Sequence, residues 1–442
     1  MRKFLAILIC RLATFVGKLV GKGTSMPGKF ALKVCPDILR RIQKPKTVIA
    51  VTGSNGKTST VEMIANVLKA SGKTVAYNIE GSNQIEGVTT MMLNSCTWGG
   101  KMKQDVLLIE SDERYTKFTF KWFHPSHYVI TNLYRDQLTR NAHPEWVFDA
   151  IKESIFDDTQ LILNADDPLV ALFGRNRKNV VWFGLDHCST DDETFVGAYH
   201  DFKYCPVCRK PLVYDYYHYN HVGKYHCSAC DFKRHDTDYA VTNIDLANKE
   251  ITLSGQKDKI QLAFKSIYNI YNTLVTYAIC RLIGIDSKTV IAATSNYTLK
   301  NGRYIEFTIG KHAGTFLIAK HENSVAYDMS FRYAVEQGNP CSVVIIVDAV
   351  SRKYFTSETS WLWDIHFDWL NAPCVQKVYL CGKYCNDLAM RMTFTDVPLD
   401  KLVVSEDISA VCEQIKNKGD EHLYAVTCFS DRMKFLSSVN VK

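Results

Sequence analysis

Apolar residues along the chain follow two periods, one typical of strands and one typical of helices. The run at 46–52 is rich in β-branched residues and ends at Gly53, and from Thr58 to Ala70 the apolar positions take helical spacing. This predicts a strand, a tight turn and a helix. Similar apolar runs predict further strands at 73–78, 105–110, 127–132 and 159–164. Strands that alternate with helical segments indicate an α/β fold with a mostly parallel, doubly wound sheet.

The pattern changes at about residue 198 and again near residue 300. From about 198 to 235 tyrosines, cysteines and histidines crowd together, which predicts an insertion, and helical spacing returns at 268–285. Later runs predict a second, Rossmann-like α/β unit with strands at 314–319, 341–349 and 376–382 and a last helix near 429–438. We therefore predict three regions: an N-terminal helical lead at 1–45, a central domain at 46–300 and a C-terminal domain at 301–442.

The opening stretch "MRKFLAILIC" looks like a secretory signal, but the apolar run is short. Arg11 interrupts it, Lys18 and Lys22 follow, and no small-residue cleavage site closes it. We predict an amphipathic helix. Packing against its own domain is the commoner use of such a helix, and contact with a membrane surface or a partner is the alternative. No later segment has the roughly 18 apolar residues of a spanning helix.

Composition and charge leave most function classes open. The chain has 442 residues, 46% apolar and 22% charged, which is typical of a globular protein with two or three domains. Its 53 basic and 46 acidic residues give a net charge of +7, which is compatible with a polyanionic ligand. No groove of interleaved basic and aromatic residues is evident, so we expect no nucleic acid among the partners.

The turn in "VTGSNGKTST" has the residues of a phosphate-binding loop. Such a loop needs backbone N–H groups that face phosphate oxygens, a helix N-terminus, a lysine and a hydroxyl for Mg²⁺. Val51 stands where the usual pattern has its first glycine, and an ordinary strand-to-helix turn is the alternative. The residues predicted to bind ATP here are Gly53, Ser54, Asn55, Gly56, Lys57, Thr58 and Ser59.

A second strand ends in acidic residues, in "LLIESDER" at 107–114. Glu110 follows a run typical of a buried strand, and parallel sheets bind ligands at the carboxyl ends of their strands. Carboxylate and hydroxyl oxygens suit Mg²⁺, so we predict Glu110 and Thr58 as magnesium ligands. For Asp112 and Glu113, exposed acids that cap a helix are an equal alternative.

Four cysteines have the spacing of a zinc ribbon. "CPVC" and "CSAC" supply Cys205, Cys208, Cys227 and Cys230, with 18 residues between the two motifs. Because four thiolates complete a tetrahedral shell, we expect a structural zinc and place the nearby histidines on the surface; these are His218, His221 and His226. The other cysteines, such as Cys96, Cys280 and Cys341, are expected to be small buried side chains. This usage favours a reducing compartment.

The loop "GSNGKT" resembles the ATP loop of the Mur ligase family, and further segments resemble the MurT branch of that family. These segments are "MPGKFALKVCPDIL" (26–39), "ITNLYRDQLTR" (130–140), "LNADDPLV" (163–170), "NIYNTLVTYAIC" (269–280), "NGRYIEF" (301–307), "SWLWDIHFD" (360–368) and "CGKYCNDLAMRM" (381–392). The resemblance implies a Mur ligase central ATPase domain with an inserted Cys₄ zinc ribbon. Three C-terminal stretches depart from the branch, so the ATP half follows the pattern better than the half that positions substrate and partner.

The resemblance also implies roles for residues outside the loop. Around adenine and ribose it implies Asn164, Asp167, Asn269 and Asn272, for which helix capping is the alternative. Asp136 would face the metal and phosphates. Arg303 would reach the phosphates, and a surface ion pair is its alternative.

The reaction implied is ATP-dependent amidation of the D-glutamate α-carboxylate of lipid II to D-isoglutamine through an acyl phosphate. Lys57 and Glu110 would act at the phosphates, and a GatD-type glutaminase would supply ammonia. Asp364 would orient the histidine of that partner, while Asp368 matches less well. The alternative for Asp364 is an acid on an edge strand beside two core tryptophans, Trp361 and Trp363.

Two other functions stay open from the residues alone. One is a Mur-type or folylpolyglutamate-type ligase that joins a whole amino acid to a carboxylate. The other is a non-catalytic, nucleotide-binding adaptor that uses its zinc ribbon to hold a partner. The expected location is the cytoplasm, with the inner face of the membrane as the alternative.

Overall fold

Contacts between residues divide the chain into two units. The computed structural model describes residues 1–19, 24–78, 82–137, 141, 143–298, 304–319, 322–348, 358–416, 422–428 and 431–441. The first unit comprises 1–134, 144–194 and 202–298, and the second comprises 135–143, 195–201 and 299–442. Each unit has a sheet of its own. No sequence pattern predicted that the two short segments at 135–143 and 195–201 group with the C-terminal residues.

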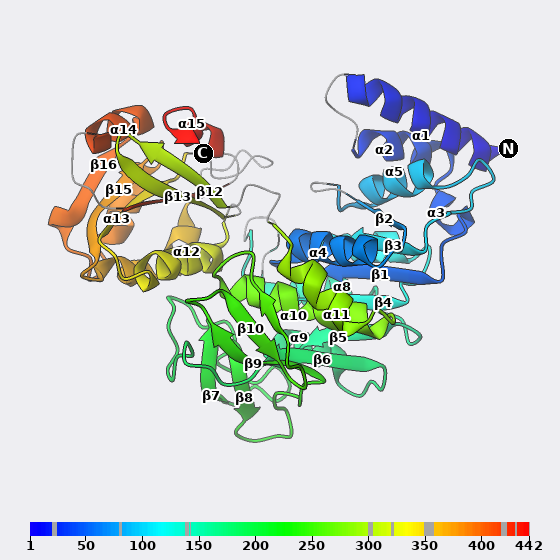
Figure 1. The fold of residues 1–442 in the computed structure, drawn as a ribbon, viewed down its shortest axis with the longest axis horizontal. Coiled ribbons are helices and arrows are strands. Elements are labelled where there is room, and N and C mark those ends of the chain that lie inside the picture. Colours follow the sequence, from blue (N-terminus) through cyan, green and yellow to red (C-terminus); the bar gives the residue numbers. More distant parts are fainter. Residues whose placement is uncertain are drawn as a thin grey trace. The chain divides into compact units, whose positions relative to one another are not determined.

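The sheet of the first unit has nine strands in the order β11-β10-β9-β6-β5-β4-β1-β3-β2 (Figure 1). The strands from β9 to β2 pair in parallel, and β10 and β11 extend the sheet in antiparallel pairing. Their bounds are β1 Thr47–Thr52, β2 Val75–Tyr77, β3 Val106–Glu110, β4 His127–Ile130, β5 Gln160–Asn164, β6 Val180–Leu185, β9 Tyr239–Asp245, β10 Glu250–Leu253 and β11 Lys259–Gln261. All five strands predicted for this sheet are confirmed, although β2 is shorter than its apolar run.

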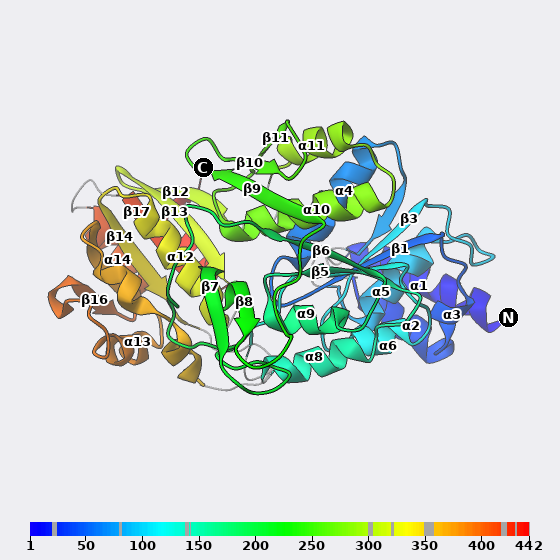
Figure 2. The ribbon, with the colours of Figure 1, turned by 90° about the horizontal axis from the view of Figure 1, so that it is seen from below.

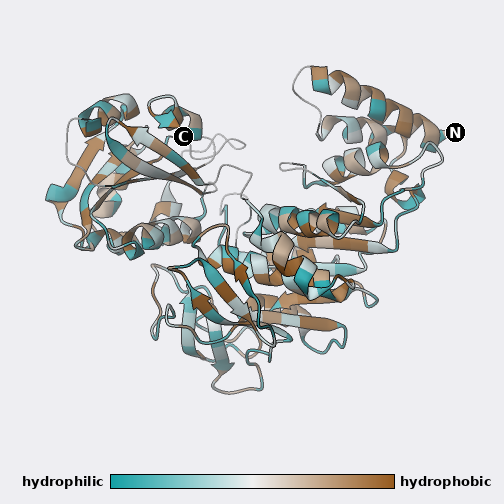
Figure 3. Cartoon of the chain, in the orientation of Figure 1, coloured by the Kyte–Doolittle hydropathy of each residue, from teal (hydrophilic) through white to brown (hydrophobic). Residues whose placement is uncertain are grey.

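Helices cover both faces of this sheet. Figure 2 shows α4 (Lys57–Ala70), α10 (Ile267–Leu282) and α11 (Ser287–Ser295) on one side. The other side carries α6 (Thr116–Phe120), α8 (Pro144–Lys152) and α9 (Pro168–Gly174). The central strands are buried on both faces, which explains why they read as continuous apolar runs (Figure 3).

The N-terminal residues form three helices on the first unit. They are α1 (Arg2–Leu19), α2 (Met26–Val34) and α3 (Ile38–Arg41), and they pack on one another and on α5 (Ile85–Ser95). The buried residues of α1 are Ala6, Ile7 and Cys10, so this face makes its contact. The predicted amphipathic helix is therefore present and packs against its own unit.

The predicted insertion contains a two-stranded antiparallel hairpin, β7 (Leu212–Tyr219) and β8 (Val222–Cys227). The hairpin bonds to the turn that follows β5. Gly223 N donates to Asp166 O at 2.9 Å, and Tyr225 Oη donates to Ala165 O at 3.1 Å. A side chain at Gly223 is excluded, since its Cβ would lie 2.2 Å from Tyr216 O. The ribbon is thereby fixed to the carboxyl end of the main sheet.

Asp166 is the centre of a buried polar network at this junction. Its carboxylate accepts from Arg234 Nε at 2.6 Å, Tyr271 Oη at 2.7 Å and Leu185 N at 2.8 Å. These residues come from the segment after the hairpin, from α10 and from β6. Because a buried carboxylate is stable only when charges and donors surround it, the network ties the ribbon, the sheet and a helix together.

Two of the three histidines placed on the surface are buried, so that expectation was wrong. His218 is 3% exposed and His221 is fully buried, whereas His226 is exposed as expected. His218 lies between two acids: its Nδ1 is 2.6 Å from Asp191 Oδ1 and its Nε2 is 3.8 Å from Asp166 Oδ2. Burial opposes the charged imidazole, but the bonds to Asp191 and Cys188 and the two nearby carboxylates raise the pKa of His218 to about 10. The aspartates are distant in sequence, so local composition could not reveal this pairing.

The second unit has a seven-stranded sheet in the order β16-β15-β14-β17-β13-β12-β18. Its strands are β12 Tyr304–Ile309, β13 His312–Ala319, β14 Cys341–Ile346, β15 Val375–Cys381, β16 Leu402–Ser405, β17 His422–Cys428 and β18 Asn440–Val441. Its helices are α12 Ser324–Glu336, α13 Cys385–Met392, α14 Ile408–Lys416 and α15 Arg432–Leu436, with short 3₁₀ turns at Ser360–Asp364, Phe367–Asn371 and Leu399–Lys401. The five strands from β16 to β13 are parallel, which confirms the predicted Rossmann-like class.

We expect the free energy of unfolding to fall as pH rises from about 7 to about 10, through the His218 pair. The unfolded histidine loses its proton near its ordinary pKa of about 6.5, while the folded one keeps it to a pKa of about 10. The folded state therefore binds more protons over this range, and alkali favours unfolding. The stabilisation is fully present below about pH 6.5.

Urea unfolding of the wild type and of His218→Gln at several pH values measures this contribution. The difference in stability between the two should shrink by on the order of 2 kcal/mol between pH 7 and 10. Using the difference cancels the titration of all other groups. Parallel pH curves for the two proteins would show that His218 is not held as an imidazolium.

Candidate functional site

The turn between β1 and α4 requires its two glycines. Gly53 and Gly56 have φ values of 136° and 86°, which side chains rarely adopt. Space forbids a side chain as well, because a Cβ at Gly53 would lie 2.2 Å from Thr131 Oγ1 and one at Gly56 would lie 2.3 Å from Asn272 Oδ1. The loop is therefore enclosed by the chain after β4 on one side and by α10 on the other.

Residues just after β4 hold the backbone of this loop. Asn55 N donates to Asn132 Oδ1 at 2.8 Å, and Thr131 Oγ1 donates to Asn55 O at 2.7 Å. Ser54 N donates to Asn132 O at 2.8 Å. The sequence analysis missed Thr131 and Asn132 as supports of the loop. The available signal was their position directly after a strand that pairs with β1.

Lys57 is buried in the first turn of α4 and has an acidic partner. Its side chain is 6% exposed, and Nζ lies 2.9 Å from Oε2 of Glu113, which is 4% exposed. The ammonium also bonds to the carbonyl oxygens of Gly53 and Ser54. Glu113 is thus an ion-pair partner of the loop rather than an exposed cap. Thr58 and Ser59 follow in the same turn, where the helix N-terminus favours anions.

Glu110 ends β3 directly beside the loop. It pairs in register with Val51 on β1, two residues before Gly53, and it is 3% exposed. Its Oε1 accepts a hydrogen bond from Asn83 Nδ2 at 3.1 Å. Asp112 instead bonds locally, accepting from Arg114 N at 3.2 Å. The carboxylate of Glu110 and the hydroxyl of Thr58 are oxygen donors on adjacent elements, and this donor chemistry fits Mg²⁺.

The four residues expected near adenine and ribose lie in two different settings. Asn164 and Asp167 are fully buried, and Asp167 caps α9 by accepting from Leu169 N and Val170 N. Asn269 and Asn272 lie on α10, where Asn272 contacts the loop and accepts from Thr60 Oγ1 at 3.2 Å. Asn269 Oδ1 is buried with no hydrogen-bond partner within the described ranges. Asp167 therefore caps a helix, as the alternative interpretation predicted. Nucleotide binding by Asn164, Asp167, Asn269 and Asn272 stays a prediction.

Further predicted residues belong to the second unit. Asp136 is buried and accepts from Asn323 Nδ2 at 2.9 Å. Asp368 accepts from Asp396 N at 2.8 Å. Arg303 lies outside the described residues, so its predicted contact with phosphate stays a prediction.

Asp364 is the last residue of the 3₁₀ turn at Ser360–Asp364, not part of an edge strand. Its Oδ2 lies 3.0 Å from Arg135 Nη1, and Arg135 also pairs with Asp201 at 2.7 Å. Burial and the charge of Asp201 raise the pKa of Asp364, and Arg135 opposes them. Trp361 is buried, but Trp363 is 48% exposed, so only the first of the two tryptophans is a core residue.

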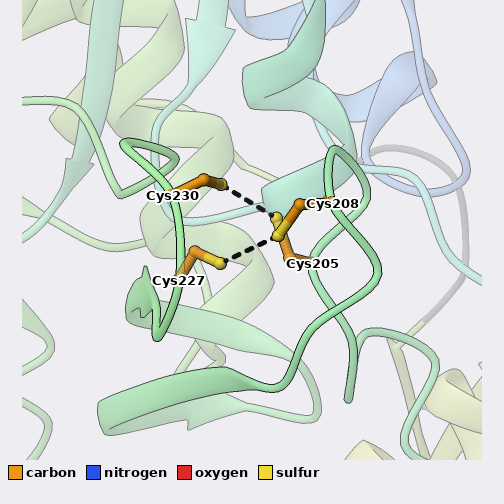
Figure 4. Close-up of side chains that lie close together, drawn as sticks. All are labelled: Cys205, Cys208, Cys227 and Cys230. Carbon is orange, nitrogen blue, oxygen red and sulfur yellow. Dashed lines mark hydrogen bonds between the residues drawn. The ribbon is translucent and has the colours of Figure 1, made fainter.

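The four cysteines of the ribbon converge on one point (Figure 4). Cys205 Sγ lies 3.7 Å from Cys230 Sγ, and Cys208 Sγ lies 3.4 Å from Cys227 Sγ. Tetrahedral zinc with Zn–S bonds of about 2.3 Å would hold its sulfurs about 3.8 Å apart, whereas a disulfide holds them at about 2 Å. The quartet therefore fits zinc and is not a pair of disulfides.

A second group, Cys188, Asp191 and His218, also brings possible metal ligands together. Here the ligand atoms of His218 and Asp191 are 2.6 Å apart, whereas two ligands of tetrahedral zinc would be about 3.3 Å apart. The shorter distance is that of a charge-assisted hydrogen bond. We assign this group as an ion pair. Cys96, Cys280 and Cys341 are buried and outside both groups, as expected.

Comparison with known proteins matches both units. Residues 51–280 match the family description "Mur ligase middle domain", and 321–431 match "MurT ligase C-terminal". The chain is 30% identical, over 95% of its length and 94% of the relative, to the MurT subunit of lipid II isoglutaminyl synthase from Staphylococcus aureus (strain COL). It is 28% identical to the subunit of the same name from Streptococcus pneumoniae (strain ATCC BAA-255 / R6), over 98% of this chain and 95% of that one.

Solved structures share the fold at lower identity. A pseudomurein peptide ligase type C from Methanothermus fervidus aligns with a TM-score of 0.68 at 22% identity, over 88% of this chain and 78% of that one. MurF from Acinetobacter baumannii aligns with a TM-score of 0.63 at 14% identity, over 92% and 80% of the two chains. Together with the two domain matches and the full-length relatives, these alignments show that the chain belongs to the Mur ligase family, in its MurT branch.

Proposed function

We propose that the chain is the ligase subunit of a glutamine-hydrolysing amidotransferase that converts the D-glutamate α-carboxylate of lipid II to D-isoglutamine. The observation that carries this proposal is the match along nearly the whole length to subunits named for lipid II isoglutaminyl synthase. The loop at 53–58 supports it, because two glycines with positive φ and a buried lysine lie at one helix N-terminus, where anions are favoured. ATP, Mg²⁺ and zinc are the proposed cofactors.

The reaction proceeds in two steps. A carboxylate oxygen attacks the γ-phosphorus of ATP, the bond to the β-phosphate bridging oxygen breaks, and ADP leaves. Ammonia then attacks the acyl carbon, loses a proton and expels inorganic phosphate, which leaves the amide. Lys57 would stabilise charge on the transferred phosphoryl group, and the backbone N–H groups in the first turn of α4, which begins at Lys57, would hold the neighbouring phosphates. Mg²⁺, when held by Thr58 and Glu110, would screen the phosphate charges.

A glutaminase partner is proposed for the surface around Asp364. The side chain of Asp364 is 16% exposed, and its Oδ1 receives no hydrogen bond from the residues that the structure describes. Large apolar side chains adjoin it: Trp363 packs on Phe394 at 5.1 Å between ring centroids, and Phe394 is 65% exposed. An apolar patch beside a free carboxylate oxygen suits a protein partner that presents a histidine.

The zinc ribbon is proposed as a structural support of the ATP site. Its hairpin bonds to Ala165 and Asp166, the central residues of the "NADD" stretch. Asn164 in turn donates to Thr131 O at 3.0 Å, and Thr131 holds the loop. A continuous chain of hydrogen bonds therefore runs from the hairpin to the phosphate-binding turn.

Removal of the loop cation should abolish ligase activity. In Lys57→Ala/Glu113→Gln both charges of the buried pair are removed, so no uncompensated charge remains. We expect ATP-dependent amidation of lipid II with the glutaminase partner to fall by on the order of 10²-fold or more. Mass analysis of the product measures the amide, and calorimetry measures ATP binding.

Lys69→Ala is the control for this variant, because Lys69 is an exposed lysine at the end of the same helix. It should keep wild-type activity. Unchanged amidation by the double variant would remove Lys57 from the mechanism.

Metal analysis should find about one zinc per chain. Cys227→Ser should lose most of this zinc and weaken ATP binding severalfold, since the hairpin would no longer hold Ala165 and Asp166 firmly. Cys374→Ser, which changes a partly exposed cysteine outside the quartet, should keep both properties. A folded wild type without metal would contradict the ribbon assignment.

Asp364→Asn should lower the glutaminase activity of the bound partner by at least on the order of a hundredfold, since a neutral amide cannot stabilise an imidazolium. ATP binding to the ligase subunit should not change. Asp368→Asn is the matched control, because that side chain bonds to a backbone amide nearby. Full glutaminase activity in the Asp364 variant would assign the residue a structural role beside Arg135.

A further inference from the structure

Helix α1 has a second apolar face, opposite the face that packs on its own unit. The packed face carries Ala6, Ile7 and Cys10. The opposite face carries larger side chains at the i, i+3 and i+4 spacing of one helix stripe. These side chains, with their exposed fractions, are Phe4 51%, Leu5 44%, Leu12 57%, Phe15 66%, Val16 57% and Leu19 73%. A stripe of this size exposed to water is unusual on a soluble protein and marks a binding surface.

Further large apolar side chains are exposed on segments that neighbour α1. On α2, Met26 is 54% exposed and Phe30 is 40% exposed. Trp98 is 48% exposed, lies 5.4 Å from the ring of Phe4 and has the Arg11 guanidinium 4.3 Å from its centroid. Tryptophan, whose apolar ring carries a polar N–H group, is enriched at membrane–water boundaries. We call α1, α2 and Trp98 the N-terminal surface.

The charge of the chain is concentrated at this surface. Residues 1–36 contain seven basic residues and no acidic residue, and the net charge of the whole chain is +7. All other segments together are therefore neutral. Four of these cations, Arg2, Lys18, Lys29 and Lys33, are exposed and make no ion pair among the residues that the structure describes. Such a cluster attracts an anionic surface.

We propose that the N-terminal surface binds the chain to a membrane that contains anionic lipids. The apolar stripe of α1 would enter the boundary between headgroups and acyl chains, and the flanking cations would contact the headgroups. A protein partner would have to match an apolar stripe and a cluster of cations that lacks any acid. An anionic bilayer offers both features over an extended plane, so the charge distribution favours the membrane.

The mode of attachment is peripheral. No helix in the described part of the chain is long and apolar enough to cross a bilayer. The exposed apolar side chains run from Phe4 to Leu19, nearly the full length of α1, so the helix would lie in the plane of the surface. Figure 3 shows that apolar residues are spread along this helix. This proposal does not depend on the proposed reaction, although a lipid-linked substrate would make membrane attachment useful to it.

Co-sedimentation of the full chain with lipid vesicles tests the proposal without substrate or partner. Vesicles of phosphatidylcholine mixed with phosphatidylglycerol should bind the protein, and vesicles of phosphatidylcholine alone should bind it at least about tenfold more weakly. Raising the salt concentration should weaken the binding to anionic vesicles. Equal binding to both kinds of vesicle, or none to either, would overturn the proposal.

Two matched pairs of variants locate the binding surface. Leu12→Glu changes a leucine that is 57% exposed on the stripe, and Leu399→Glu changes one that is 62% exposed in the second unit. Leu12→Glu should weaken vesicle binding about tenfold or more, while Leu399→Glu should not. Lys18→Glu should act like Leu12→Glu, and Lys257→Glu, at an exposed lysine of the first unit, should have no effect.

Light scattering after gel filtration tests whether a second copy of the chain, instead of a membrane, covers the stripe. If the stripe were covered by a second copy of the chain, the wild type would be a dimer that Leu12→Glu converts to a monomer. That result, combined with weak vesicle binding, would contradict the proposal. A wild-type monomer that binds anionic vesicles supports it.

Discussion

The fit of a short backbone turn between two neighbouring elements is the constraint on which the rest of the first unit depends. At Gly53 and Gly56 the loop passes so close to Thr131 and Asn272 that no side chain fits. Its amides and carbonyls are bonded to the chain after β4, so the register of β4 against β1 sets the position of the loop. The conformation of this glycine turn is therefore a property of the assembled sheet. The local sequence contributes only the two glycines that allow the positive φ values of the turn.

The buried pair of Lys57 and Glu113 follows from the same constraint. Burying either charge alone in this enclosed position would carry a large desolvation free energy. The attraction between the two charges offsets most of it, so the pair adds little net stability. Because the net stabilisation by the pair is small, a phosphate oxygen would replace Glu113 as the partner of the ammonium with little loss of free energy. Two acids that end or follow β3 have different contacts, since Glu110 accepts a hydrogen bond from Asn83 beside the loop while Glu113 pairs with Lys57. Their shared position after one apolar strand concealed this difference in the sequence.

Sequence reasoning succeeded where a function depends on neighbours in the chain. The apolar strands of both sheets, the glycine loop and the cysteine quartet all have local patterns, and each of them is present in the structure. It failed where partners come from distant segments. His218 is held by Asp191 and Asp166, and Thr131 supports a loop that lies far ahead of it in the chain. Burial of a histidine or a lysine depends on compensation by such distant charges, and no window of local sequence contains that information.

The N-terminal helix shows why two uses of one amphipathic pattern need not compete. From the sequence, packing on its own unit and contact with a membrane were alternatives, because one stripe was assumed to serve one purpose. In the structure one face of α1 packs on its own unit, and the opposite face is apolar and exposed. The buried residues of α1, which packs on α2 and α5, are Ala6, Ile7 and Cys10, and Phe15 and Leu19 stay exposed. If α1 served only to cover its unit, its outer face would be expected to be polar. The large apolar side chains exposed there, within residues 1–36 that contain seven basic and no acidic residue, are the reason for proposing an apolar and anionic surface as the second contact of α1.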